Sequence, residues 1–178
     1  LVLIIIFFFL QNFRATLVPA TTVPVTIIGA FFAMLLLGYS INLLTLFALV
    51  LAIGIVVDDA IVIVEGVTQH IEKGKSPKDA SIYAMKELMG PIIGITLVLM
   101  AVFVPAGFMP GLTGAMYAQF ALVIAATAFI SAINAMTLKP TQCALWLKPV
   151  DTQKEKNFIF RYFDKLYYPI ENTYVNFI

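Results

Sequence analysis

The stretch 54-GIVVDDAIVIVE-65 places two adjacent aspartates, Asp58 and Asp59, inside a run that is otherwise almost entirely aliphatic. Removing a carboxylate from water is energetically costly, so two neighbouring carboxylates in an apolar run need a specific explanation. The pair has a different meaning in the core of a soluble domain and in a membrane span. The composition of the whole chain decides between these two interpretations.

The composition is that of an integral membrane protein. Of the 178 residues, 61% are hydrophobic and 12% are charged, whereas an average soluble domain has about 25% charged residues. A single histidine, His70, and a single cysteine, Cys143, provide neither a cluster of metal ligands nor an internal disulfide. The chain also contains no nucleotide-binding glycine loop. We therefore expect no metal site, no bound cofactor, no enzymatic activity and no nucleic-acid partner.

Five apolar runs predict an all-α fold, a polytopic bundle of transmembrane helices. A helix needs about 20 residues to cross the hydrocarbon layer of a membrane. The spans are expected at about residues 1–10, 17–38, 41–64, 90–108 and 117–138. The first run is about half a span, which gives one partial and four full helices. Because the sequence starts inside an apolar run and stops as another begins, we interpret it as an internal piece of a longer polytopic protein.

The distribution of basic residues predicts the orientation of these helices. All eleven Lys and Arg residues fall at Arg14, in residues 66–89, or in the segment from Lys139 onward. Alternating spans would place these three regions on one face, which the positive-inside rule assigns to the cytoplasm. We accordingly expect a multi-pass membrane protein whose basic loops are cytoplasmic. Residues 149–178 are expected to form an amphipathic interfacial segment on the cytoplasmic side.

The charged segment at residues 66–89 is predicted to be a long loop that contains a short surface helix. Ser76-Pro77-Lys78-Asp79 has the pattern of a capping box with proline at the first helical position. We expect this helix to end near Met89, before Gly90-Pro91.

The aspartates lie about 8 Å inside the predicted cytoplasmic end of their span at Val64. Burial and a neighbouring like charge both disfavour the ionised form of a carboxyl group, so the pair is expected to exchange protons as a coupled unit. Gly54, one turn before Asp58, would leave room for another helix to approach. The predicted loops contain every lysine and arginine, so any counter-ion is expected from helices outside this sequence. The alternative is a hydrogen-bonded polar pair that only fixes helix packing.

Several other polar residues fall within the predicted spans. Asn42, Thr45 and Asn134 are expected to be satisfied by hydrogen bonds between helices, and we assign them no further function.

The sequence around the aspartates resembles one transporter family. GIVVDDAIVIVE is similar to the fourth transmembrane helix of the resistance-nodulation-division (RND) superfamily, in its AcrB-like hydrophobe/amphiphile multidrug efflux branch. The similarity extends through QNFRATLVP, SINLLTLFALVLAIG, VFVPAGFMPGLTGAMYAQF and LKPTQCALWLKP, and so covers essentially the whole chain. Lys139 departs from the family pattern, because a small polar residue is expected at that position.

The resemblance implies a transporter driven by the proton-motive force, in which Asp58 and Asp59 form the intramembrane proton relay. It also implies hydrophobic or amphiphilic substrates and a homotrimer that works with a periplasmic adaptor and an outer-membrane channel. In the family, the matching aspartates pair with a lysine from the second half of the transporter. Two alternatives stay open at this point, namely an RND-type exporter of a lipid or other non-drug solute, and a membrane scaffold or sensor that does not transport.

Overall fold

The described part of the chain consists of six α-helices joined by short connections. The computed structural model describes residues 2–10 and 12–148, so the interfacial segment predicted at residues 149–178 lies outside the described residues. The helices are α1 (Val2–Leu10), α2 (Phe13–Leu36), α3 (Leu43–Glu72), α4 (Pro77–Ala106), α5 (Gly111–Met136) and α6 (Leu138–Trp146).

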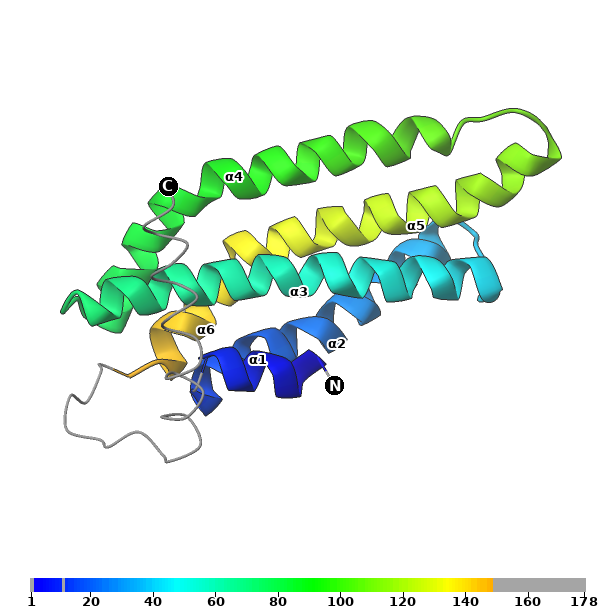
Figure 1. Ribbon diagram of the computed structural model, residues 1–178. Coiled ribbons are helices and arrows are strands. Elements are labelled where there is room, and N and C mark those ends of the chain that lie inside the picture. Colours follow the sequence, from blue (N-terminus) through cyan, green and yellow to red (C-terminus); the bar gives the residue numbers. More distant parts are fainter. Residues whose placement is uncertain (1, 11, 149–178) are drawn as a thin grey trace, which may run out of the picture.

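The four long helices lie side by side and alternate in direction, with α1 beside α2 and α6 at one end of the bundle (Figure 1). Helix α3 packs against α2, α4, α5 and α6, so the helix that contains the aspartates also connects most of the others. By length and composition, α2, α3, α4 and α5 continuing into α6 are each able to cross a membrane. The predicted all-α bundle, with one partial and four full spans, is confirmed.

The predicted helix after Ser76 is present, but the predicted extent of the loop at residues 66–89 and the predicted end of that helix near Met89 are wrong. Helix α3 continues beyond Val64 to Glu72, and α4 starts at Pro77 and runs without interruption through Gly90 and Pro91. An internal proline removes one helical hydrogen bond, but α4 contacts both α3 and α5, and Ile92, next to Pro91, is buried in the core that these helices share. Packing of this kind outweighs local helix propensity. Only a short turn at residues 73–76 separates the two helices.

Polar contacts fix this turn. The Ser76 side chain accepts a hydrogen bond from the backbone N–H of Asp79 at 3.2 Å, which confirms the predicted N-terminal cap of α4. The Lys75 ammonium lies 3.4 Å from the centre of the Tyr83 ring, a close cation–π contact. The turn is thus held to the first turns of α4.

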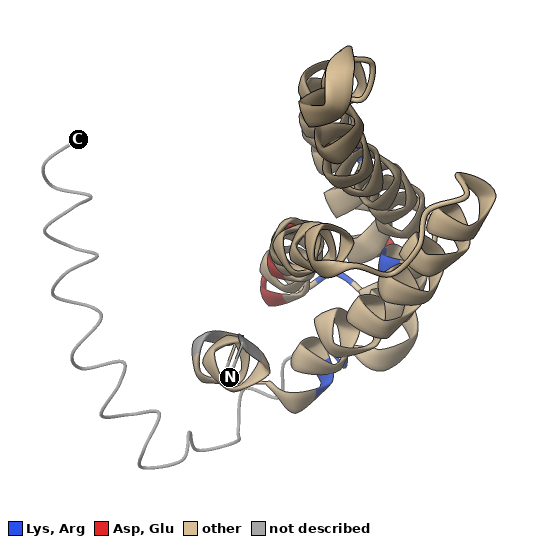
Figure 2. Cartoon of the chain, turned by 90° about the vertical axis from the view of Figure 1, so that its right-hand side faces the viewer, with Lys and Arg blue, Asp and Glu red and all other residues tan. Residues whose placement is uncertain are grey.

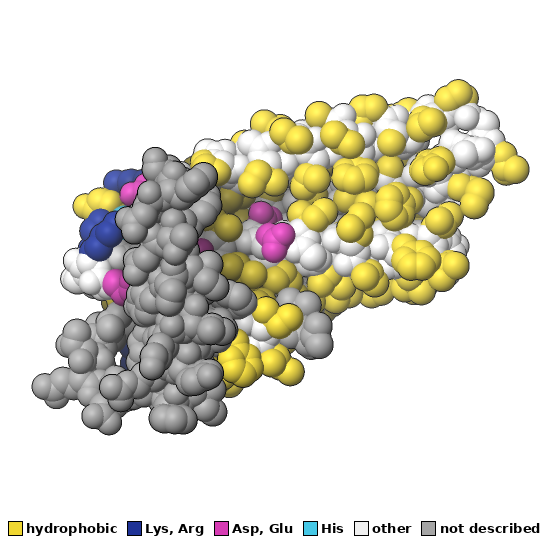
Figure 3. All heavy atoms as spheres, viewed as in Figure 1, with side chains coloured by type: hydrophobic (Ala, Val, Ile, Leu, Met, Phe, Trp, Pro, Cys, Tyr) yellow, Lys and Arg dark blue, Asp and Glu magenta, His cyan; other side chains and the backbone are white. Residues whose placement is uncertain are grey.

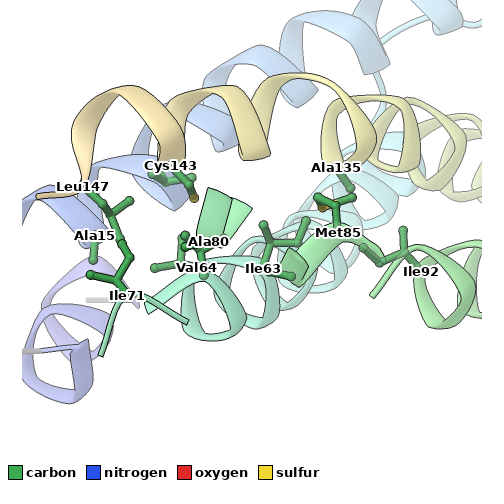
Figure 4. Packing of buried hydrophobic residues seen from close by; sticks show 13 residues of the cluster. Ala15, Ile63, Val64, Ile71, Ala80, Met85, Ile92, Ala135, Cys143 and Leu147 are labelled. Carbon is green, nitrogen blue, oxygen red and sulfur yellow. The ribbon is translucent and has the colours of Figure 1, made fainter. Parts of the chain in front are cut away.

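The hydrophobic core at the α6 end of the bundle joins five helices. It contains the fully buried Ile63 and Val67 of α3 together with residues of α2, α4, α5 and α6 (Figure 4). Small residues line α5, which lets neighbouring helices approach closely. They are Ala121, Ala125, Ala128, Ser131, Ala132 and Ala135.

Hydrogen bonds between helices satisfy two of the three polar residues singled out in the sequence. The Asn42 side chain donates to Gln119 at 2.6 Å, and the Asn134 side chain donates to Thr26 at 3.4 Å. Thr45 instead completes the capping box of α3, with its hydroxyl oxygen accepting from the Asn42 backbone N–H at 2.9 Å.

Where the structure describes them, the three basic regions meet at one end of the bundle. Arg14, at the start of α2, donates to the backbone carbonyl of Trp146 in α6 at 3.3 Å. Ile71, near the end of α3, belongs to the same hydrophobic cluster as Ala15 and Leu147. The first, second and third basic regions are therefore neighbours in space, as alternating spans require.

Gly66 lies at a close contact between α3 and α4 and provides a test of this packing. A Cβ atom at Gly66 would lie 2.9 Å from Leu88 Cδ1 and 3.7 Å from Ala84 Cβ. We expect Gly66→Ile to overpack the contact and to lower the free energy of unfolding by about 1–3 kcal/mol, measured by unfolding of the purified full-length protein in mixed micelles.

Gly66→Ala is the matched control, and it should be tolerated because the flexible end of Leu88 can shift. Adding Leu88→Ala to Gly66→Ile should recover part of the lost stability. If Gly66→Ile alone were as stable as the parent, the two helices would not be packed in this way.

Candidate functional site: the aspartate pair inside the bundle

The two aspartates have different surroundings although they are adjacent in sequence. Consecutive side chains on a helix point about 100° apart, so Asp59 turns toward the bundle interior and is half-buried while Asp58 is exposed. Among the described residues, Asp58 makes no hydrogen bond or ion pair. The carboxyl group of Asp59 thus faces the interior of the bundle, and that of Asp58 faces outward.

Asp58 lies on a surface that is otherwise apolar. On the face shown in Figure 3, hydrophobic side chains cover most of the bundle, basic residues gather near one end, and an acidic patch interrupts the hydrophobic surface partway along. Figure 2 shows the bundle turned by 90°, and in this view too the charged residues make up only small parts of the helices. Asp58 is exposed, and the residues that surround it along α3 are aliphatic apart from the adjacent Asp59 and, two turns further on, Glu65.

Ser131 of α5 anchors the inward carboxyl group. Its hydroxyl donates to Asp59 Oδ2 at 3.0 Å, and Ser131 itself is fully buried. The neighbouring small residues of α5, such as Ala128 and Ala132, allow α5 to pack closely against α3. The contact fixes the orientation of the Asp59 carboxyl group.

Lys139, in the first turn of α6, also enters this region. Its side chain is completely buried, and its ammonium donates to the backbone carbonyl of Val56 at 3.4 Å. Val56 precedes Asp59 by one helical turn, so the ammonium lies beside the same part of α3. The opposite charges of Lys139 and Asp59 therefore lie beside the same part of α3, although no direct contact within 4.0 Å joins these two described side chains.

The expectation that every cation of this chain lies in a loop is therefore wrong for Lys139. Helix α5 ends at Met136 and α6 begins at Leu138, so Thr137 alone separates them. Lys139, the second residue of α6, has a long flexible side chain. Its ammonium group points into the bundle instead of toward the charged end. A buried positive charge is therefore present within this chain, beside the turn of α3 that contains Asp59.

Gly54 is exposed, and a Cβ atom added there would meet no atom within 4 Å. No described helix approaches α3 at this position, and its role as a point of close helix approach stays a prediction. Within the described ranges, no group of three or more His, Cys, Asp or Glu side chains is arranged to hold a metal ion.

Ser131 and Lys139 were not identified as site residues from the sequence. A serine in an Ala-rich span is typical of helix packing, and a lysine at the end of a span is typical of a headgroup contact. The one signal was that Lys139 departs from the small polar residue expected there.

Comparison with known proteins identifies the family. The model of the AcrB/AcrD/AcrF family matches residues 1–178. The chain is 43% identical over 179 residues to the multidrug export protein AcrF of Escherichia coli, covering 99% of this chain and 17% of that protein. It is 46% identical over 151 residues to the toluene efflux pump membrane transporter TtgB of Pseudomonas putida, covering 84% of this chain and 14% of TtgB.

A third relative, the multidrug resistance protein MdtF of Escherichia coli, is 43% identical over 169 residues, covering 94% of this chain and 16% of MdtF. The chain thus spans about a sixth of the length of these relatives. The chain belongs to the AcrB/AcrD/AcrF family of RND multidrug efflux transporters.

Proposed function

We propose that this chain supplies the proton-relay helices of an efflux transporter that exchanges protons for hydrophobic or amphiphilic compounds. The observation that carries the proposal is the pair Asp58 and Asp59 on an apolar helix, with Asp59 held inside the bundle by Ser131. Ionisable residues within membrane helices most often mark a proton or ion pathway. The energy source is the proton-motive force, and no other cofactor is involved.

The names of the relatives support the substrate class. AcrF and MdtF are named for multidrug export and resistance, and TtgB for toluene efflux. We propose that the substrates here are likewise hydrophobic or amphiphilic small molecules, which are transported without chemical change. A drug or solvent substrate is favoured over a dedicated lipid substrate on this ground.

The arrangement of the chain in the cell is also part of the proposal. The basic end of the bundle faces the cytoplasm of a bacterial inner membrane, and the exposed apolar side chains contact lipid or other parts of a longer transporter. The assembly is a homotrimer that works with a periplasmic adaptor and an outer-membrane channel.

In the full-length transporter, Asp58→Asn and Asp59→Asn should each abolish proton-driven export while leaving membrane insertion intact. Each substitution keeps the shape of the side chain but removes its ability to gain and lose a proton. Drug accumulation in cells, and proton flux in liposomes under an imposed pH gradient, measure the loss.

Glu72→Gln is the matched control, because Glu72 is an exposed acid at the end of the same helix. It should leave export unchanged. Full drug resistance in cells with either aspartate variant would refute the relay, and absence of proton flux in the parent protein would favour a scaffold.

Ser131→Ala should lower the rate of export by roughly tenfold, because a hydrogen bond to a charged group is worth about 1.5–3 kcal/mol. Ser131→Thr retains the hydroxyl and should keep most of the activity. Initial rates of substrate export from proteoliposomes measure both effects. Equal rates for Ser131→Ala and the parent would show that the hydrogen bond to Asp59 has no part in the relay.

A further inference from the structure

Lys139 is the one fully buried charged residue among the Lys, Arg, Asp and Glu residues that the structure describes. Burying an ammonium group away from water is costly unless other groups compensate its charge. The hydrogen bond to the Val56 carbonyl is long at 3.4 Å, and that carbonyl is also an acceptor within α3. This contact alone does not account for a buried cation.

The position of Lys139 in its own helix does not explain its burial either. It lies in the first turn of α6, where the helix dipole is positive and disfavours a cation. A favourable interaction must therefore come from another helix. The acidic groups on the facing helix α3 are the inward Asp59, the outward Asp58, and two exposed glutamates, Glu65 nearly two turns beyond Asp59 and Glu72 at the end of the helix.

The geometry favours Asp59 as the acid that compensates the charge of Lys139. Residues three apart on a helix share a face, so the Val56 carbonyl that Lys139 contacts lies on the same side of α3 as the Asp59 carboxyl group. Ser131 approaches that carboxyl group from α5, while Lys139 approaches from α6. Two neighbouring helices thus bring a hydrogen-bond donor to the Asp59 carboxyl group and a positive charge to the same side of α3.

We propose that Lys139 is a resident counter-charge for Asp59, supplied by the same half of the transporter as the aspartates. The two carboxyl groups then have different roles. Asp59 is held in place by Ser131 and Lys139, and the exposed Asp58 is the group available to partners outside this bundle. Lys139 acts as a positioning residue. The difference in roles rests on the proposed proton relay, whereas the charge pairing does not.

A double-mutant cycle on the purified full-length transporter tests the pairing. Lys139→Met and Asp59→Asn should each lower the unfolding midpoint, because each leaves one buried charge without its partner. The double variant should lose less than the sum of the two single losses. Additive losses would overturn the inference. The cycle of Lys139→Met with Asp58→Asn is the control, and it should show the smaller coupling of the two.

Conservative variants distinguish the effect of the Lys139 charge from the effect of its hydrogen bond. They also test the inference if Lys139→Met fails to fold. Lys139→Gln keeps a donor for the Val56 carbonyl but has no charge, whereas Lys139→Arg keeps the charge. Export should fall by roughly tenfold or more in Lys139→Gln, and Lys139→Arg should retain more export than Lys139→Gln. Lys148→Gln, which removes an exposed lysine just beyond α6, should match the parent.

Parental export in Lys139→Gln would show that a hydrogen-bond donor suffices, and the inference would be wrong. That result is distinguishable from failure of the proton relay. If Asp59→Asn abolishes export while Lys139→Gln does not, only the role of Lys139 is refuted. If Asp59→Asn itself exports normally, the proposed relay is refuted, and the stability cycle still tests the charge pair.

Discussion

The placement of two opposite charges inside an apolar bundle, Asp59 on α3 and Lys139 on α6, is the constraint that the surrounding structure has to satisfy. Asp59 and Lys139 lie in a bundle built mostly from aliphatic side chains, where each charge is costly unless the other groups compensate it. Ser131 reaches the carboxyl group because α5 is lined by small residues. Lys139 reaches the same turn of α3 because α6 follows α5 after a single residue. The local sequences of α3, α5 and α6 thus place these side chains around the same turn of α3, the turn that contains Asp59.

The difference between Asp58 and Asp59 connects this constraint to transport. One carboxyl group is fixed inside the described bundle, and the other faces outward among apolar side chains. In the relatives, most of the chain lies beyond the matched segment. A longer transporter therefore has helices available to cover Asp58, while Asp59 already has its contacts within this chain. In the proposed relay, Asp59 is thus the member with fixed contacts, and Asp58 is the member whose surroundings change.

Hydropathy predicted the one partial and four full spans, because a membrane span is encoded by a long apolar run, but it did not predict the short helix α6. It failed where charged residues continue a helix beyond the apolar run, as at the end of α3 and the start of α4, since helix formation does not stop at the hydrocarbon boundary. Asp58 and Asp59 were identifiable because acids stand out in an aliphatic run. Lys139 was assigned to the charged end because sequence position does not show which way a long side chain turns. Ser131 was missed because its role depends on which helix faces it.

The central claim is that the aspartate pair gains and loses protons, and infrared difference spectroscopy on the intact transporter tests it most directly. Protonation of a carboxylate creates the carbonyl stretching band of a neutral carboxylic acid. The account predicts that such a band appears between mildly alkaline and mildly acidic conditions, and that Asp58→Asn or Asp59→Asn removes it. If both groups stayed ionised throughout that range, the pair would not carry protons and the account would be wrong.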